Sequence, residues 1–388
     1  MSRKCPICAS SDNQLLYEQS FKNSVKAFLD GYSVVSCDLC GFIFADNIPS
    51  QEVFNEYYGR IEKYEFNYGD GRVSSDYGEY FKNVFGFIDC HVKNDKNIKI
   101  LDIGCASGDL LNVFKENGYG DLLGIEPSVG SDDKAHDLYG VNVINDSLQN
   151  IELNEEFDLI ILSAVLEHLV DISEVMGHVN DLLKDNGLLF IEVPDVERFH
   201  ESIPAPFQQF NMEHVNFFSE YSLKNLMSKW GLDVVDISFE DCVADSVVMP
   251  DLYLLSRKTS GNNSEIMFDV KSNKAISRYI EYSEIISHKL NSAVVDIIDG
   301  VDRVMVWGVG THTKFLLDFG LNIEKVSCFI DSNSRYKGGF LNGVEIIEPN
   351  MINQDIPILI SSLSYHEEIE VQIRSVLKLE NKILNIYH

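Results

Sequence analysis

The sequence contains few basic side chains and no long apolar run. Lysine and arginine together number 31 against 61 aspartates and glutamates, so the formal net charge at pH 7 is −30. Such a charge repels nucleic-acid phosphates and anionic membranes. No run approaches the roughly 18 apolar residues of a membrane helix, and residues 1–5 lack the apolar region of a signal peptide. We therefore expect a cytoplasmic protein, monomer or homodimer, that binds a small-molecule substrate and neither nucleic acid nor membrane.

The chain is too long for one ordinary core, and its motifs divide it into four parts. Residues 1–55 carry two cysteine pairs, and residues 56–258 alternate short apolar runs with amphipathic segments. Residues 259–296 show a helical spacing of apolar side chains, and residues 297–388 form a second alternating unit. Alternation of this kind predicts an α/β fold with parallel sheets covered by helices. Strands are expected at 98–103, 121–125, 141–145, 157–163, 187–193, 303–307, 325–330 and 357–361.

Four of the eight cysteines form two close pairs near the N-terminus. Cys5 and Cys8 make the first C-x-x-C pair and Cys37 and Cys40 the second, which Gly41 follows directly. Each pair can place two thiolates on a common tetrahedral ion, and glycine suits the tight turn of such a knuckle. The pattern predicts a structural zinc. The alternatives are chance spacing and a redox dithiol, which is disfavoured because no thioredoxin-like pattern surrounds either pair.

A glycine-rich turn follows the first strand that is expected in the second part. It reads Asp102-x-Gly104-x-Ala106-x-Gly108 and leads into an amphipathic segment. Alone, this pattern also fits a tight turn or a dinucleotide site. Glu126 closes the next strand, where a carboxylate can accept hydrogen bonds from both ribose hydroxyls.

The ordered motifs resemble those of class I S-adenosylmethionine-dependent methyltransferases. In that family the turn of small residues admits the cofactor, and its acidic residue, here Asp102, contacts the methionine end. Asp146 matches the adenine-contacting position, and residues 157–169 resemble the fourth strand and the helix after it. Glu126 and Asp146 could instead be solvated carboxylates, and His168 could serve packing. The resemblance implies a Rossmann-like domain that binds S-adenosyl-L-methionine through Asp102, Gly104, Ala106, Gly108, Glu126, Pro127, Asp146, Ser147, Ser163 and Tyr68.

A carboxylate and a histidine adjoin in Glu213-His214, after the fifth strand. A histidine oriented by a carboxylate suits proton removal, because its unperturbed pKa is about 6.5. The stretch is similar to one in zinc-containing sugar C-methyltransferases, which act on nucleotide-linked ketosugars, use this histidine as the proposed base and share the same order of parts. Asn211 stands where that family has a tyrosine, and residues 245–249 replace a glycine-rich strand, so carbon and oxygen methylation both stay open. Alternatively, His214 is a buried histidine that shapes the loop.

Tyrosines crowd the segment before the glycine turn and alternate there with glycines. This composition suits a mobile lid that excludes water, although packing of the tyrosines is an equal reading. The tyrosines are Tyr57, Tyr58, Tyr64, Tyr68, Tyr77 and Tyr80.

The fourth part opens with a second glycine turn, residues 308–314, that resembles a Rossmann-like dinucleotide-binding turn. Thr313 occupies the third glycine position, which weakens the case for a nicotinamide cofactor. An anion at the following helix start remains sensible, and nearby Lys314, Arg335 and Lys337 are either phosphate contacts or solvated charges. We expect Lys314, Lys337 and Asn211 to contact the acceptor.

Taken together, these motifs predict methyl transfer from S-adenosyl-L-methionine to a sugar, nucleotide-linked, in polysaccharide or secondary-metabolite biosynthesis. His214 and Glu213 are the expected catalytic residues. The alternatives are a nicotinamide-dependent sugar oxidoreductase that uses the second glycine turn, and a non-catalytic binding protein.

Overall fold

The computed structural model describes residues 3–21, 28–60, 75–92, 95–203, 205–244, 247–259, 266–333, 336–362 and 365–386. The chain folds as two compact units. The first unit comprises Met1–Gln19, Tyr32–Ser202 and Met212–Ile276, and the second comprises Ser20–Gly31, Ile203–Asn211 and Ser277–His388. Among the described helices, none is long and apolar enough to cross a membrane.

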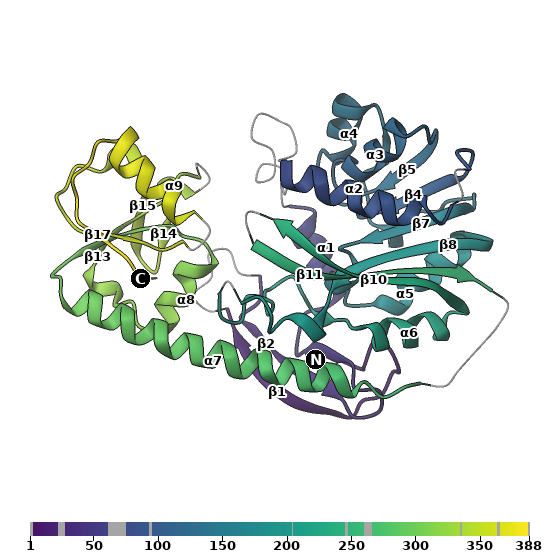
Figure 1. Ribbon diagram of the computed structural model, residues 1–388, viewed down its shortest axis with the longest axis horizontal. Coiled ribbons are helices and arrows are strands. Elements are labelled where there is room, and N and C mark those ends of the chain that lie inside the picture. The colour runs from purple at the N-terminus through teal and green to yellow at the C-terminus, as the bar shows by residue number, and fades with distance from the viewer. Residues whose placement is uncertain are drawn as a thin grey trace. The chain divides into compact units, whose positions relative to one another are not determined.

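A seven-stranded sheet forms the centre of the first unit, in the order β10-β11-β8-β7-β4-β5-β6 (Figure 1). The pairs among β8, β7, β4, β5 and β6 are parallel, whereas β11 is antiparallel to both β8 and β10. The α/β fold that the sequence predicts is confirmed. The strands are β4 (Lys99–Ile103), β5 (Asp121–Ile125), β6 (Asn142–Ile144), β7 (Phe157–Ser163), β8 (Leu183–Pro194), β10 (Leu232–Ala244) and β11 (Val247–Lys258).

Helices cover both faces of this sheet, because successive strand side chains point to opposite faces and both are apolar. On one face Leu101 and Ile103 share a core with α5 and α6. On the other, Ile100 packs with residues of α2 and α3. The helices of the unit are α1 (Gln51–Tyr58), α2 (Ser75–Asp89), α3 (Asp109–Glu116), α4 (Ser131–Tyr139), α5 (Ile172–Leu182) and α6 (Glu220–Lys229).

A small sheet connects the cysteine-bearing segment to the segment that contains His214. It runs β1 (Asn13–Ser20), β2 (Gly31–Cys37), β3 (Ile43–Asp46) and β9 (Asn216–Phe217). β3 and β9 are antiparallel, with Phe44 opposite Asn216. The cysteine segment therefore directly supports the chain beside His214.

The second unit has its own six-stranded sheet, in the order β14-β15-β13-β12-β16-β17. All its pairs are parallel except the β14–β15 pair. The helical spacing seen in residues 259–296 corresponds to the long helix α7 (Val270–Asp299; Figure 1). The remaining elements are β12 (Val304–Trp307), α8 (Thr311–Phe319), β13 (Val326–Ile330), β14 (Phe340–Leu341), β15 (Val344–Ile347), β16 (Ile358–Ile360), α9 (His366–Val371) and β17 (Ile383–Leu384).

Candidate active site

The turn after β4 requires small residues for two separate reasons. Gly104, Ala106 and Gly108 have φ angles of 78°, 52° and 79°, in the left-handed region that favours glycine. In addition, a Cβ on Gly104 would lie 2.6 Å from Cγ2 of Val165. The turn therefore has no room for larger side chains, and its backbone packs closely against its neighbours.

The carboxylate of Glu126 reaches this turn from the end of β5. Its Oε2 accepts a hydrogen bond from the amide of Ala106 at 3.1 Å. Its Oε1 accepts bonds from the amide and the hydroxyl of Ser128 at 3.0 and 2.6 Å. The side chain is thus fixed beside the glycine turn, where it can meet the hydroxyls of a ribose.

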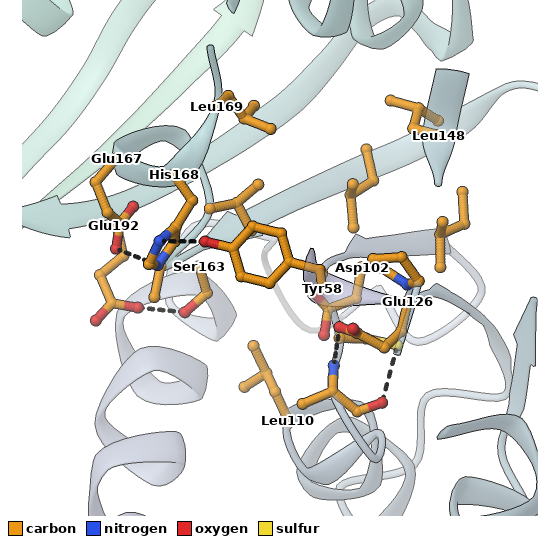
Figure 2. Close-up of a pocket in the computed structure, with 18 of the residues that line it drawn as sticks. Tyr58, Asp102, Leu110, Glu126, Leu148, Ser163, Glu167, His168, Leu169 and Glu192 are labelled. Atoms are coloured by element: carbon orange, nitrogen blue, oxygen red, sulfur yellow. Dashed lines mark hydrogen bonds and ion pairs between the residues drawn. The ribbon is translucent and has the colours of Figure 1, made fainter. Parts of the chain in front are cut away.

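A cavity of about 510 Å³ opens at the carboxyl ends of β4, β5, β7 and β8. Ligands bind at this edge of open parallel sheets, and the volume suits a cofactor-sized molecule. Figure 2 shows Asp102 and Glu126 on one side of the Tyr58 ring and Glu167 and His168 on the other. Of the residues expected from the sequence, the cavity brings together Asp102, Gly104, Ala106, Glu126, Pro127, Ser147, Ser163 and His214.

Other expected site residues do not line this cavity. Gly108 caps the start of α3, and Asp146 accepts hydrogen bonds from the amide of Ser147 and from Asn150. The Glu213 carboxylate accepts a hydrogen bond from the hydroxyl of Tyr57 at 3.1 Å. Tyr64, Tyr68 and Arg335 lie outside the described residues.

The three expected acceptor contacts all belong to the second unit, namely Asn211, Lys314 and Lys337. Lys314 lies in α8, where burial lowers the pKa of its ammonium. Lys337 is exposed and forms an ion pair with Glu348, with 2.7 Å between Nζ and Oε2.

The cavity lining is strongly acidic. Among its described residues there are six carboxylates and no lysine or arginine: Asp102, Asp109, Glu126, Glu167, Glu192 and Asp251. Burial, reinforced by the nearby charges of Glu126 and Glu192, raises the pKa of Asp102 to about 8. Burial likewise raises the pKa of Glu192 to about 6 and that of Asp251 well above its ordinary value. This environment favours a cationic ligand and disfavours phosphate groups.

Two histidines and a glutamate gather at the other end of the cavity. Nδ1 of His168 lies 3.0 Å from the carbonyl oxygen of Glu213 and 3.1 Å from the hydroxyl of Tyr58. Its Nε2 lies 3.6 Å from Oε1 of Glu167, and its ring centroid is 5.0 Å from that of His214. Residues from three distant parts of the chain therefore meet at this end of the cavity.

Sequence reasoning missed the cavity residues Glu192 and Asp251 and placed Tyr80 only among the tyrosines of a possible lid. Tyr80 donates a hydrogen bond to the Glu192 carboxylate and lies 2.9 Å from Oγ of Ser163. Asp251 reaches the same region from β11, which was not among the expected strands. A polar residue inside an otherwise apolar run, as Glu192 is in residues 188–194 of β8, was the available signal.

The four paired cysteines converge in the first unit. Sγ of Cys5 is 3.5 Å from Sγ of Cys40, and Sγ of Cys8 is 3.4 Å from that of Cys37. All four sulfur atoms lie within 4.8 Å of one another. Four convergent thiols suit one tetrahedral zinc ion. Gly41 closes the second knuckle with φ 74°, and a Cβ there would lie 2.7 Å from the carbonyl oxygen of Asp269.

The second glycine turn is closed by hydrogen bonds of its own side chains. Thr313, at the third glycine position, donates to the carbonyl of Gly308 at 2.7 Å and lies 2.7 Å from Oγ of Ser361. Asp331, after β13, accepts a hydrogen bond from the amide of Val309 at 3.0 Å. The turn therefore has the strand, loop and acidic residue of a nucleotide fold.

Comparison with known proteins finds two matching families. A family described as a methyltransferase domain matches residues 80–237, and one described as C2185-like, N-terminal matches residues 300–384. The C-methyltransferase NovU of Streptomyces niveus is 25% identical over 293 residues, which cover 71% of this chain and 68% of NovU.

One further sequence and one solved structure match a smaller part of the chain. A ubiquinone biosynthesis O-methyltransferase of Rhodopseudomonas palustris (strain HaA2) is 29% identical over 101 residues, which cover 24% of this chain and 39% of that enzyme. The magnesium protoporphyrin IX methyltransferase ChlM from Synechocystis PCC 6803, solved with bound SAM, has a TM-score of 0.41 and 14% identity over 55% of this chain and 98% of ChlM.

The seven-stranded sheet, the glycine turn with its strand-end glutamate and the family match together define a methyltransferase domain. The protein is an S-adenosylmethionine-dependent methyltransferase.

Proposed function

We propose that the protein methylates a nucleotide-linked sugar in the biosynthesis of a polysaccharide or secondary metabolite. The observation that carries the proposal is that one cavity is lined by residues of the glycine turn, by Glu126 and by His214. The similarity to NovU, a C-methyltransferase, supports methyl transfer. The Glu213-His214 stretch, which resembles one in sugar C-methyltransferases, supports a sugar acceptor.

For the cofactor, we assign the methionine ammonium to Asp102, the ribose hydroxyls to Glu126 and the adenine to the Asp146–Ser147 region. The acidic lining supports this assignment, because both the ammonium and the sulfonium of the cofactor are cationic. Gly104, Ala106 and Gly108 would allow the backbone to approach the cofactor closely.

For the chemistry, we assign His214 as the base, with Glu213 as the neighbour that orients its loop. His214 takes a proton from an acceptor hydroxyl or from a carbon beside a carbonyl. The freed electron pair attacks the methyl carbon in line, the carbon–sulfur bond breaks, and a neutral thioether leaves.

We further propose a structural zinc at Cys5, Cys8, Cys37 and Cys40, and nucleotide binding by the second unit. Four convergent thiols support the zinc. The absence of lysine and arginine from the described cavity lining supports a separate location for the phosphates, with Lys314 and Lys337 as contacts.

The test is methyl transfer from radiolabelled S-adenosyl-L-methionine to a nucleoside-diphosphate 4-ketosugar, to its 4-hydroxy counterpart and to both sugars without the nucleotide. We expect label only in a nucleotide-linked sugar, and loss of label in His214→Gln with unchanged cofactor binding. Solvent deuterium entering beside the carbonyl would identify carbon methylation. No transfer to any of these sugars by protein that binds the cofactor would refute the sugar assignment, and tight NADH binding would favour an oxidoreductase.

A further inference from the structure

The guanidinium of Arg3, just before the first cysteine knuckle, donates hydrogen bonds to several backbone carbonyls. Nη2 bonds the carbonyls of Leu169 and Val170 at 3.0 and 2.6 Å. Nη1 bonds the carbonyl of Val215 at 3.1 Å and that of Ala45 at 3.4 Å. One side chain therefore collects carbonyl groups from three separate segments of the first unit.

Two of these segments carry the cavity histidines. Leu169 directly follows His168, and Val215 directly follows His214. Nη2 of Arg3 also donates a hydrogen bond to Oδ1 of Asn216 at 2.9 Å. The Asn216 amide in turn donates to the carbonyls of Leu166 and Leu169, both at 2.7 Å.

The position of Arg3 is set by the cysteine segment. The knuckle turn is closed by bonds from the amide of Cys5 to Ser10 and from the amide of Ala9 to Cys5, at 2.9 and 2.8 Å. The backbone amide of Arg3 donates to Asp46, and its guanidinium carbon lies 5.7 Å from the Phe44 ring centroid. Only the planar, five-donor fork of arginine can serve this many acceptors in different directions.

We propose that Arg3 is a positioning residue that fixes the His168 and His214 segments relative to each other. It would thereby connect the cysteine knuckle to the proposed base. The relevance of Arg3 to catalysis rests on the proposed role of His214. The placement of the two histidine segments by Arg3 does not depend on that role. Removal of the guanidinium would leave carbonyls of both segments without their charged donor, and the two rings would no longer keep their mutual orientation.

The test compares Arg3→Lys and Arg3→Met with Lys4→Met, which removes the same charge from the adjacent exposed residue. The readout that needs no acceptor is the imidazole ¹⁵N spectrum, with His168 and His214 identified by signals lost in their glutamine variants. We expect both signals to shift in Arg3→Lys but not in Lys4→Met, with zinc content and cofactor Kd unchanged. With the nucleoside-diphosphate ketosugar, kcat should fall at least about tenfold while the cofactor KM holds.

Unshifted histidine signals in folded Arg3→Lys would overturn the proposal, as would a parallel loss of cofactor affinity, which would indicate general damage. If Arg3→Met does not fold, Arg3→Lys still decides the question, because it retains the charge. Absence of sugar methylation in the wild-type protein would refute the proposed acceptor and leave the histidine spectra as an independent test.

Discussion

Asp102 lines the cavity and is almost completely buried, since only 2% of its surface is exposed. Its raised pKa of about 8 means that the carboxyl is largely protonated below neutral pH. A protonated carboxyl cannot pair with an ammonium. Cofactor binding should therefore expel a proton from this site.

Cofactor affinity should consequently rise between pH 6 and 7.5. The sign follows because binding favours the ionised form of Asp102, whose population increases as pH approaches its pKa of about 8. Calorimetry in buffers of different ionisation enthalpy measures both the affinity and the proton released. Methylthioadenosine, which lacks the methionine ammonium, is the control and should show no such slope. A steep slope that persists in Asp102→Asn would contradict the assignment.

Glu126→Gln should weaken S-adenosyl-L-methionine binding by about 10- to 100-fold, because the neutral amide replaces one acceptor with a donor and removes charged hydrogen bonds. Isothermal titration gives the Kd directly. The control is Asp121→Asn, an exposed carboxylate at the opposite end of the same strand, β5. Equal affinities of the two variants would count against ribose contact by Glu126.

Asp102 and Glu126 could be predicted from the sequence because each stands at a fixed place in a local motif, at a strand end or in a turn. Tyr58, His168 and Asp251 have no such local signature. His168 gains its place only through contacts with Tyr58 and Glu213, which are distant in the chain. Contacts of that kind follow from tertiary packing and cannot be found from spacing alone.

At the scale of single elements, the β4–α3 turn leaves no space for an added methyl group at Gly104. Gly104→Ala should destabilise the protein by ~2–3 kcal/mol, since the new Cβ would overlap Val165 as well as occupy a left-handed φ. Urea denaturation measures the change. Gly118→Ala is a matched control, because Gly118 also has positive φ, 91°, but a Cβ there meets no atom within 4 Å. Similar losses in both variants would show that steric overlap contributes little.

The parallel strands of the first unit were predictable because buried strands between amphipathic segments give a strong pattern, and β5 and β7 begin and end at the expected residues. In the second unit, the short parallel strands β15 and β17 were not predicted. The antiparallel pair β10 and β11 was not predicted. Its outer strand carries exposed apolar side chains such as Phe239 and Val243, which blur the alternation that marks a half-buried strand. The two-residue strand β9 is too short to give any periodic signal.

At the scale of the whole molecule, two separate parallel sheets occur in one chain, and their units are interleaved in sequence. Residues Ser20–Gly31 and Ile203–Asn211 group with the C-terminal unit although the segments around them belong to the first. The order of motifs predicts contiguous parts. It could not reveal these two segments, because composition carries no information on which unit a short segment packs with. The matched methyltransferase domain, residues 80–237, accordingly includes residues of both units.

The proposed division of labour between the units predicts the effect of removing two lysines from the second one. Lys314→Ala with Lys337→Ala should weaken binding of a nucleoside diphosphate at least about tenfold, because phosphate loses two cationic partners, and leave cofactor affinity unchanged. Calorimetry with each ligand measures both effects. Lys289→Ala with Lys378→Ala removes two exposed lysines of the same unit as a control. Unchanged diphosphate affinity in the Lys314, Lys337 variant would refute the phosphate site.

The acidic lining of the cavity also bears on turnover. Methyl transfer converts the sulfonium into an uncharged thioether, so the spent cofactor carries one positive charge fewer than the molecule that entered. Six carboxylates without a nearby lysine or arginine in the described lining attract that product less strongly. The charge of the cavity thus favours S-adenosyl-L-methionine over its demethylated product. We expect this product to be a comparatively poor inhibitor of S-adenosyl-L-methionine binding.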